Sequence, residues 1–274
     1  MCDLIRSDFR RVLKDKLFMV VCIIALAFAV FMPLLYMLLF SGLDAMTSGM
    51  ISGYVTAKGQ FFAAFALADN MGLIVPILLT IILCKDFSFG TVRNKIISGH
   101  SRTQIFLSMY VVCAVVLWVI IFLHSLLTMC VSLLFFEYQA DPFTWADFGY
   151  FMASVGFEFL VYLFAAALVS YLCVSAKNMG LTIVSYAAIN LGAGLVGSIL
   201  MISSQVLAFD ESKEKTVKVL DFFQRINPFV ASQYIGAGTS YELKDLIYHL
   251  LMPLALAALL ILLGISKFNR KDLK

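Results

Sequence analysis

"LFMVVCIIALAFAVFMPLLYMLLF", residues 17–40, is a run of 24 residues without a charged side chain. A helix needs about 20 mainly apolar residues to cross the hydrocarbon core of a bilayer, so this run alone can span a membrane. The apolar part of a cleaved signal peptide is shorter, about 7 to 15 residues, and is followed by a small-x-small cleavage site that is missing here. We therefore expect a retained span and an all-α integral membrane protein.

The rest of the sequence repeats this feature. Of the 274 residues, 62% are hydrophobic and only 14% are charged, and the mean hydropathy is +0.96, which lies outside the range of soluble domains. Long apolar runs without alternation favour helices, because a span in lipid must satisfy its backbone hydrogen bonds internally. We predict a single transmembrane domain over 1–274 with six helical spans. Besides 17–40, they are residues 66–84, 104–126, 150–173, 180–203 and 246–265.

The basic residues are divided unevenly between the two sides that these spans define. Residues 1–16 hold five Lys or Arg, 85–102 hold four, 267–274 hold four and Lys177 adds one, which makes fourteen on one side against six on the other. Cytoplasmic loops carry such an excess of Lys and Arg. Both termini and the 85–102 loop are therefore predicted to be cytoplasmic.

The formal net charge of +3 does not call for a nucleic-acid partner. Basic loops beside a membrane contact anionic lipid headgroups, so the lipid bilayer is the expected partner and no nucleic acid is expected. The six cysteines lie in spans or at predicted cytoplasmic ends, where disulfides are rare. We expect neither disulfides nor a metal cluster.

Enzyme motifs receive little support. Residues 192–197, "GAGLVG", match the dinucleotide fingerprint in letters, but they lie inside a predicted span and lack the required strand and acidic residue. Small residues in a membrane helix more commonly allow close packing. The chain has no Walker sequence for ATP, and its three histidines form no metal motif. No catalytic residue is predicted, and the chain is not expected to be an enzyme.

Polar residues inside spans are the next candidates, because they are costly to hold in lipid and are usually paired or functional. Glu158 lies inside the fourth span, and either a structural partner within the bundle or a place on a transport path explains it. Asp69 lies nearer the surface of the second span. Asn190 in the fifth span is a candidate for the path and also for interhelical hydrogen bonding.

The loop "KDFSFGTVRNKIISGHSR", residues 85–102, is longer than a connector between two spans requires. We predict a short amphipathic helix that begins near Thr91 and ends at Gly99. Its apolar stripe includes Val92 and Ile96 and can extend to Ile97, and Arg93 and Lys95 are expected to point elsewhere. Ser101 is predicted to cap the third span. Two uses remain open, since the helix can rest on lipid headgroups or dock against a protein.

Asp86, the pair Gly90 and Thr91, Arg93 and the run "GHSR" at Gly99–Arg102 resemble the signature of ABC-transporter permeases of the type-2 export family, which includes small bacterial drug and antimicrobial-peptide exporters. The order of elements is also similar: a basic amphipathic N-terminal segment, six spans, this loop between spans two and three, and a long insertion before the last span. The resemblance covers nearly the whole chain. It implies a multi-pass protein of the bacterial plasma membrane.

In that family the loop between spans two and three is a coupling helix that docks on a separate ATPase subunit. By resemblance, Gly90 and Thr91 shape its start, Gly99 ends it, and Arg93 and Arg102 face polar groups of the ATPase or lipid phosphate. Residues 1–16 resemble the connecting helix along the cytoplasmic face. Two departures concern the docking surface: many members carry Pro in place of Gly99 and Lys in place of Met109.

The segment 204–245 is predicted to lie outside the cell. Val217, Leu220, Phe223 and Ile226 repeat every third residue and indicate an amphipathic helix that stops at Asn227-Pro228. A second, more apolar piece follows. Such a helix pair resembles the re-entrant or lid helices of the family's exporters, although an external loop folded on the headgroups also fits the pattern.

The resemblance thus implies a permease subunit of an ATP-driven ABC exporter that works with a second permease subunit, identical or related. ATP and Mg are expected on the partner ATPase, and this chain is expected to bind no cofactor. The apolar composition suits a hydrophobic or amphipathic cargo such as an antimicrobial peptide, a drug or a lipid. The main rival is an ATP-independent transporter or channel that uses Glu158 and Asp69. A membrane-bound enzyme is a third, weaker hypothesis.

Overall fold

The computed structural model describes residues 1–40, 56–139, 142–176, 178–207, 209, 213–237 and 243–271. Within these ranges the regular secondary structure is helical throughout. Six helical segments are long and apolar enough to cross a membrane, which confirms the prediction of an all-α, multi-pass membrane protein. Lys177, which contributed to the predicted charge asymmetry, and parts of the 204–245 segment lie outside the described residues.

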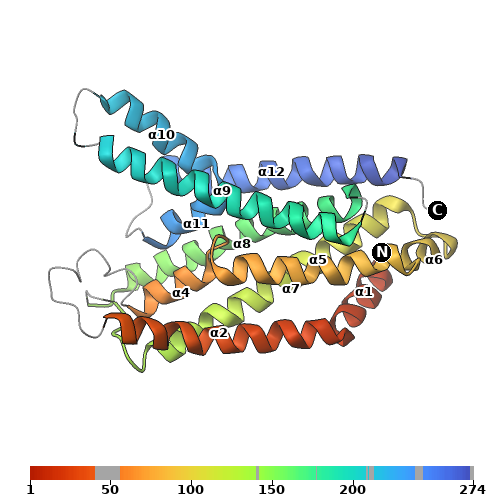
Figure 1. Ribbon diagram of the computed structural model, residues 1–274, viewed down its shortest axis with the longest axis horizontal. Coiled ribbons are helices and arrows are strands. Elements are labelled where there is room, and N and C mark those ends of the chain that lie inside the picture. Colours follow the sequence, from red (N-terminus) through yellow and green to blue (C-terminus); the bar gives the residue numbers. More distant parts are fainter. Residues whose placement is uncertain are drawn as a thin grey trace.

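Five of the predicted spans coincide with single long helices (Figure 1). Two short helices, α1 (Cys2–Lys14) and α6 (Thr91–Ile97), lie at the end of the bundle that also holds both ends of the chain. We call this end, with α1, α6 and the last turn of α12, the basic end. The long helices are α2 (Lys16–Phe40), α7 (Arg102–Ser132), α8 (Trp145–Ser175), α9 (Met179–Leu207) and α12 (Leu243–Arg270).

Helix α8 forms the centre of the bundle. The small side chains Ala165, Ala166 and Ala167 are buried on it together with Tyr162, so that neighbouring helices can approach closely. Helices α2 and α9 instead expose most of their apolar side chains. His124 on α7 holds α2 in place, since its Nδ1 lies 2.8 Å from the Ala25 carbonyl oxygen.

The second span differs from its predicted form, which began at residue 66. It consists of α4 (Ala57–Phe65) and α5 (Asn70–Ser88), and the helix is broken between them. Side chains of α8 and α9 satisfy carbonyl groups around the break, as a buried backbone in lipid requires. Three side chains donate these hydrogen bonds: Tyr162 Oη to Phe65 O at 2.7 Å, Asn190 Nδ2 to Leu67 O at 3.1 Å, and Tyr186 Oη to Gly72 O at 3.0 Å.

The insertion before the last span contains the two predicted helices, α10 (Glu214–Ile226) and α11 (Pro228–Ala237), separated at Asn227. Helix α11 packs against α4, α8 and α9 at the end opposite the basic end (Figure 1). A side chain at Gly197 would overlap Val230 of α11, and Asn227 Nδ2 donates to the Ala193 carbonyl oxygen at 2.8 Å. Gly197 therefore serves helix packing, as predicted for the small residues of 192–197, whereas no atom lies within 4 Å of a Cβ added at Gly192 or Gly194.

Gly72→Ala tests the broken span. The added methyl group would overlap the Leu67 carbonyl group, and overpacking of this kind costs about 1 to 3 kcal/mol. We expect a lower midpoint of thermal unfolding in detergent. Gly194→Ala is the matched control, because no atom lies within 4 Å of the position its methyl group would occupy. Equal midpoints for the two variants would contradict the close approach of Gly72 to the Leu67 carbonyl group.

Candidate functional site

Helix α6 is held between two glycines with left-handed backbone conformation. Gly90, with φ of +69°, is the residue before Thr91, and Gly99 has φ of +88°. Glycine adopts such angles without steric penalty. The helix is closed by hydrogen bonds from Gly99 N to Ile96 O at 3.0 Å and from His100 N to Lys95 O at 3.1 Å. The predicted short helix therefore exists, and Gly99 ends it as the resemblance implies.

The third span begins directly after this turn. Ser101 Oγ accepts a hydrogen bond from Gln104 N at 3.3 Å, and Gln104 Oε1 accepts one from Ser101 N at 3.1 Å. This reciprocal capping box satisfies two backbone groups that a helix start leaves open. The prediction that Ser101 caps the span is confirmed. The turn from α6 into α7 is therefore defined at both sides, by Gly99 and by Ser101.

A group of buried charges connects α6 to α1 and α5. We call Asp8, Arg11, Asp86 and Lys95 the charge cluster. Lys95 Nζ lies 2.6 Å from Asp8 Oδ1 and 3.4 Å from Asp86 Oδ2, and Arg11 forms an ion pair with Asp86. Both carboxylates are only 3% exposed. Two positive and two negative side chains compensate each other, as buried charges require.

The local sequence explains why Asp8 lies inside. Leu4, Asp8 and Val12 are spaced by four residues and share one face of α1, which is buried. Ser108 on α7 supports this carboxylate by donating a hydrogen bond from Oγ to Asp8 Oδ2 at 2.7 Å. Burial lowers the pKa of Lys95, although its hydrogen bond to Asp8 acts in the opposite direction. Burial likewise lowers the pKa of Arg11.

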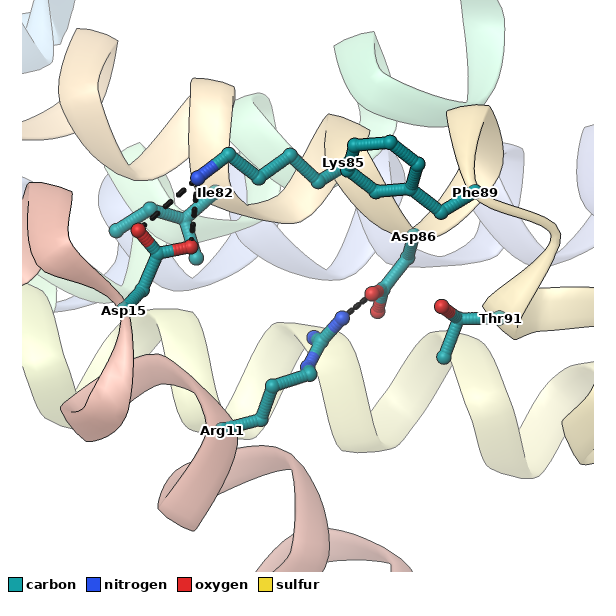
Figure 2. A pocket seen from close by; sticks show the side chains of 7 residues that line it. All are labelled: Arg11, Asp15, Ile82, Lys85, Asp86, Phe89 and Thr91. Atoms are coloured by element: carbon teal, nitrogen blue, oxygen red, sulfur yellow. Dashed lines mark hydrogen bonds and ion pairs between the residues drawn. The ribbon is translucent and has the colours of Figure 1, made fainter.

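A second ion pair lies beside the cluster. Lys85 Nζ contacts both carboxylate oxygens of Asp15, at 2.9 and 2.7 Å. Partial burial raises the pKa of Asp15, but the hydrogen bond from Lys85 and others outweigh it, so the pKa falls below its usual value. Figure 2 shows this pair and the pair of Arg11 and Asp86 on opposite sides of a pocket of about 320 Å³. Ile82, Phe89 and Thr91 complete its lining.

Arg102 joins the loop to the end of the chain. Its guanidinium group donates from Nη1 to the carbonyl oxygens of Phe268 at 3.1 Å, Asn269 at 3.1 Å and Lys271 at 2.6 Å. A cation is favourable beside the open carbonyl groups at a helix C-terminus. Lys271 in turn donates from Nζ to the Val174 carbonyl oxygen at the end of α8, at 2.8 Å. The side chain that the resemblance directs toward a partner or lipid is thus used within this chain.

The outward side of α6 and its two ends carry exposed side chains, among them Asn94 and Ser98. Phe89 is 78% exposed and Ile97 is 75% exposed, and Arg93 is exposed between them. Val92 is buried and Ile96 packs against the core, as the predicted apolar stripe requires, but Ile97 does not belong to the buried stripe. Lys95, which was predicted only to point away from the stripe, points inward to the charge cluster. We call Phe89, Arg93 and Ile97 the exposed tip.

The three intramembrane candidates lie apart from the loop, near the broken span. Asn190 donates to the Leu67 carbonyl oxygen, and Glu158, which is completely buried, lies one turn before Tyr162 on α8. Asp69 is in the break itself and directly precedes α5. The predicted coupling residues and the predicted path residues therefore form two separate regions.

Comparison with known sequences gives one match. Residues 45–274 match the family described as "Protein of unknown function (DUF2705)". The chain belongs to the DUF2705 family. No curated protein matches the chain. In this DUF2705 protein the matched region includes Asp86 and Lys95 of the charge cluster, whereas Asp8 and Arg11 precede it.

Sequence reasoning missed most of the charge cluster. The sequence predicts the loop and places Lys95 off its apolar stripe, but it assigns no partner to Lys95 and no role to Asp8. One signal for Asp8 is present in the sequence, because an acidic residue occupies the middle of the apolar stripe formed with Leu4 and Val12. An acidic residue at such a position calls for a basic partner. The sequence does not indicate that Lys95, 87 residues later, is that partner.

Lys95→Met tests the charge cluster. The change leaves two buried carboxylates with only Arg11, and removal of one member of a buried ion pair costs about 3 to 5 kcal/mol. We expect a clearly lower midpoint of thermal unfolding and faster proteolysis near residues 85–102. Arg93→Met is the control, because Arg93 is an exposed cation on the same helix and surface changes usually stay within about 0.5 kcal/mol. The same loss in both variants would refute a special role for Lys95.

Proposed function

We propose that this DUF2705 chain is the transmembrane permease subunit of an ATP-driven ABC exporter, coupled to a separate ATPase subunit that holds ATP and Mg. The observation that carries the proposal is the construction of α6. It is a short helix with two fixed ends, a buried ionic attachment to α1 and α5, and an exposed tip. A helix of this kind can receive a force and pass it to the spans.

The attachments of the loop support the transmission of force. The charge cluster connects α6 to α1 and to the last turn of α5, while Arg102 connects the start of α7 to the end of α12. A displacement of α6 therefore acts on several spans together. Charge-assisted hydrogen bonds of 2.6 to 2.7 Å resist such displacement better than isolated apolar contacts do.

The exposed tip has the composition of a protein-binding site. Phe89 and Ile97 provide apolar anchors, and Arg93 provides a cation that suits a carboxylate on the partner. Aromatic residues and Arg are enriched among the side chains that dominate binding energy, and they act best when a pocket on the partner encloses them. A groove on the ATPase with an acidic rim would satisfy all three side chains of the tip.

In the proposed mechanism two permease subunits, identical or related, form the cargo path and each binds one ATPase. Closure of the ATPase pair moves the two α6 helices together, and the bundles rock to open the path on the opposite side. ATP must then bind with different free energy in the two permease conformations, because otherwise it shifts no equilibrium. The cargo class is hydrophobic or amphipathic, and includes antimicrobial peptides, drugs and lipids.

The ATP-independent transporter is the second candidate, and the broken span favours it. Transporters place substrate sites at interrupted helices near the bilayer midplane. In this chain, however, the 15 residues of α5 before Lys85 cover about 22 Å of the hydrocarbon core, which is about 30 Å thick. The break therefore lies past the midplane, on the side opposite the basic end. Three carbonyl groups around it already accept hydrogen bonds from Tyr162, Asn190 and Tyr186, which supports a structural purpose.

The double variant Phe89→Asp, Ile97→Asp tests docking. Purification in mild detergent is expected to recover a Walker-type ATPase in about equal amount with the unaltered chain, and at least about tenfold less with the variant, because truncation of one dominant anchor costs 2 kcal/mol or more. Phe209→Asp is the control, since Phe209 is 92% exposed and follows the far end of α9. An unaltered chain purified alone in high yield would refute the proposal.

Transport energetics separate the two candidates. We expect cargo export from vesicles to require ATP and to persist when an ionophore collapses all ion gradients. Glu158→Gln, which keeps the size of the side chain and removes its ionisable group, is expected to leave ATP-driven export in place. Loss of gradient-driven flux in a variant that still folds would instead establish the ATP-independent transporter and give Glu158 a place on its path.

A further inference from the structure

Two buried cysteines from different spans lie in contact below the loop. Cys84 on α5 and Cys173 on α8 are both free thiols, and their sulfur atoms are 3.4 Å apart. Thr182 at the start of α9 lies beside them, with its Oγ1 3.7 Å from the Cys84 sulfur. Three helices therefore meet at this point. We call Cys84 and Cys173 the thiol pair.

Each cysteine of the thiol pair is next in sequence to a residue that attaches the basic end to the bundle. Cys84 immediately precedes Lys85 and Asp86, which form ion pairs with Asp15, directly after α1, and with Arg11 of α1. Cys173 immediately precedes Val174, whose carbonyl oxygen accepts the hydrogen bond from Lys271. The thiol pair thus connects the part of α5 that leads into the loop with the part of α8 that holds the end of the chain.

We propose that the thiol pair is an oxidation site, at which a disulfide between Cys84 and Cys173 fastens α5 to α8. The sulfur atoms must approach from 3.4 Å to about 2.05 Å, a movement that side-chain rotation and a small helix shift can supply. The pair lies near the ends of its two helices, since α5 ends at Ser88 and α8 ends at Ser175.

The proposed oxidant is a peroxide. One thiol loses its proton and attacks a peroxide oxygen as the thiolate, the O–O bond breaks, and a sulfenic acid and hydroxide are formed; the hydroxide takes up the released proton and leaves as water. The second thiolate then attacks the sulfenic sulfur, forms the S–S bond and displaces hydroxide, which takes up a proton and leaves as water. Two electrons pass from the thiols to the peroxide, and two thiols and one peroxide give one disulfide and two waters. A dithiol reductant reverses the step by exchange.

A disulfide here would prevent the base of the loop from moving relative to α8. This functional consequence rests on the proposed function, because transport coupled to an ATPase requires α6 to move the spans. Oxidation is then expected to arrest the transport cycle and reduction to restore it. The formation of the disulfide itself depends only on the geometry of the thiol pair.

The chemical test uses the full-length chain in lipid nanodiscs. After treatment with hydrogen peroxide, remaining thiols are blocked and the protein is digested without reductant. We expect mass spectrometry to find the peptides of Cys84 and Cys173 joined and two hydrogens lighter than their sum. Cys113→Ser is the matched control, because Cys113 is another buried thiol of this core, and the joined peptides should persist in it. Recovery of both thiols unlinked in the folded chain overturns the proposal.

The functional test compares the ATPase complex before and after oxidation. We expect turnover to fall by about tenfold in the unaltered complex and to return with dithiothreitol, since conformational steps limit many such cycles. Cys84→Ser and Cys173→Ser should both resist oxidation, and their thermal midpoints show that they fold. If the disulfide forms and turnover does not change, the proposed control of the transport cycle by oxidation is wrong. If no ATPase is bound, the proposed function fails while the chemical test still decides the oxidation site.

Discussion

The charge cluster is the interaction on which the basic end depends. Asp8 and Asp86 are tolerated in a buried position only because Lys95 and Arg11 neutralise them. These four side chains come from three segments, α1, α5 and α6. If any one segment moved away, a buried charge would lose its partner. Such a cluster contributes little net stability, because removal of the charges from water offsets their attraction. Its effect is to specify one arrangement of the segments.

The opposite end of the bundle meets the same requirement with uncharged groups. The broken span exposes carbonyl oxygens that lipid cannot satisfy, and hydroxyl and amide groups of α8 and α9 donate to them. Uncharged donors carry a smaller desolvation penalty than ions. They therefore suit carbonyl groups within a span, whereas ion pairs suit the basic end near water. The charge cluster and the donors at the broken span thus satisfy one requirement in two different surroundings.

Features that depend on a single segment could be predicted from the sequence. Apolar length identified the six spans, Gly99 and Ser101 marked the end of one helix and the start of the next, and Asn227-Pro228 marked the boundary between α10 and α11. Features that depend on two distant segments could not. The helix α4 contains Lys58 and Gln60 and is weakly apolar, so its continuation of the second span appears only when α7 and α11 pack on it. The partnership of Asp8 and Lys95 is of the same kind.

The orientation of α6 bears on the choice between a lipid-resting helix and a docking helix. A helix that rests on a bilayer turns its apolar stripe toward the lipid and its charges toward water. In α6 the stripe of Val92 and Ile96 is packed against the bundle, and Lys95 is also turned inward. The side left exposed carries Arg93 and Asn94, with Phe89 and Ile97 at its edges. Aromatic side chains and Arg are enriched at the cores of protein interfaces, so this arrangement favours the docking helix of the two alternatives.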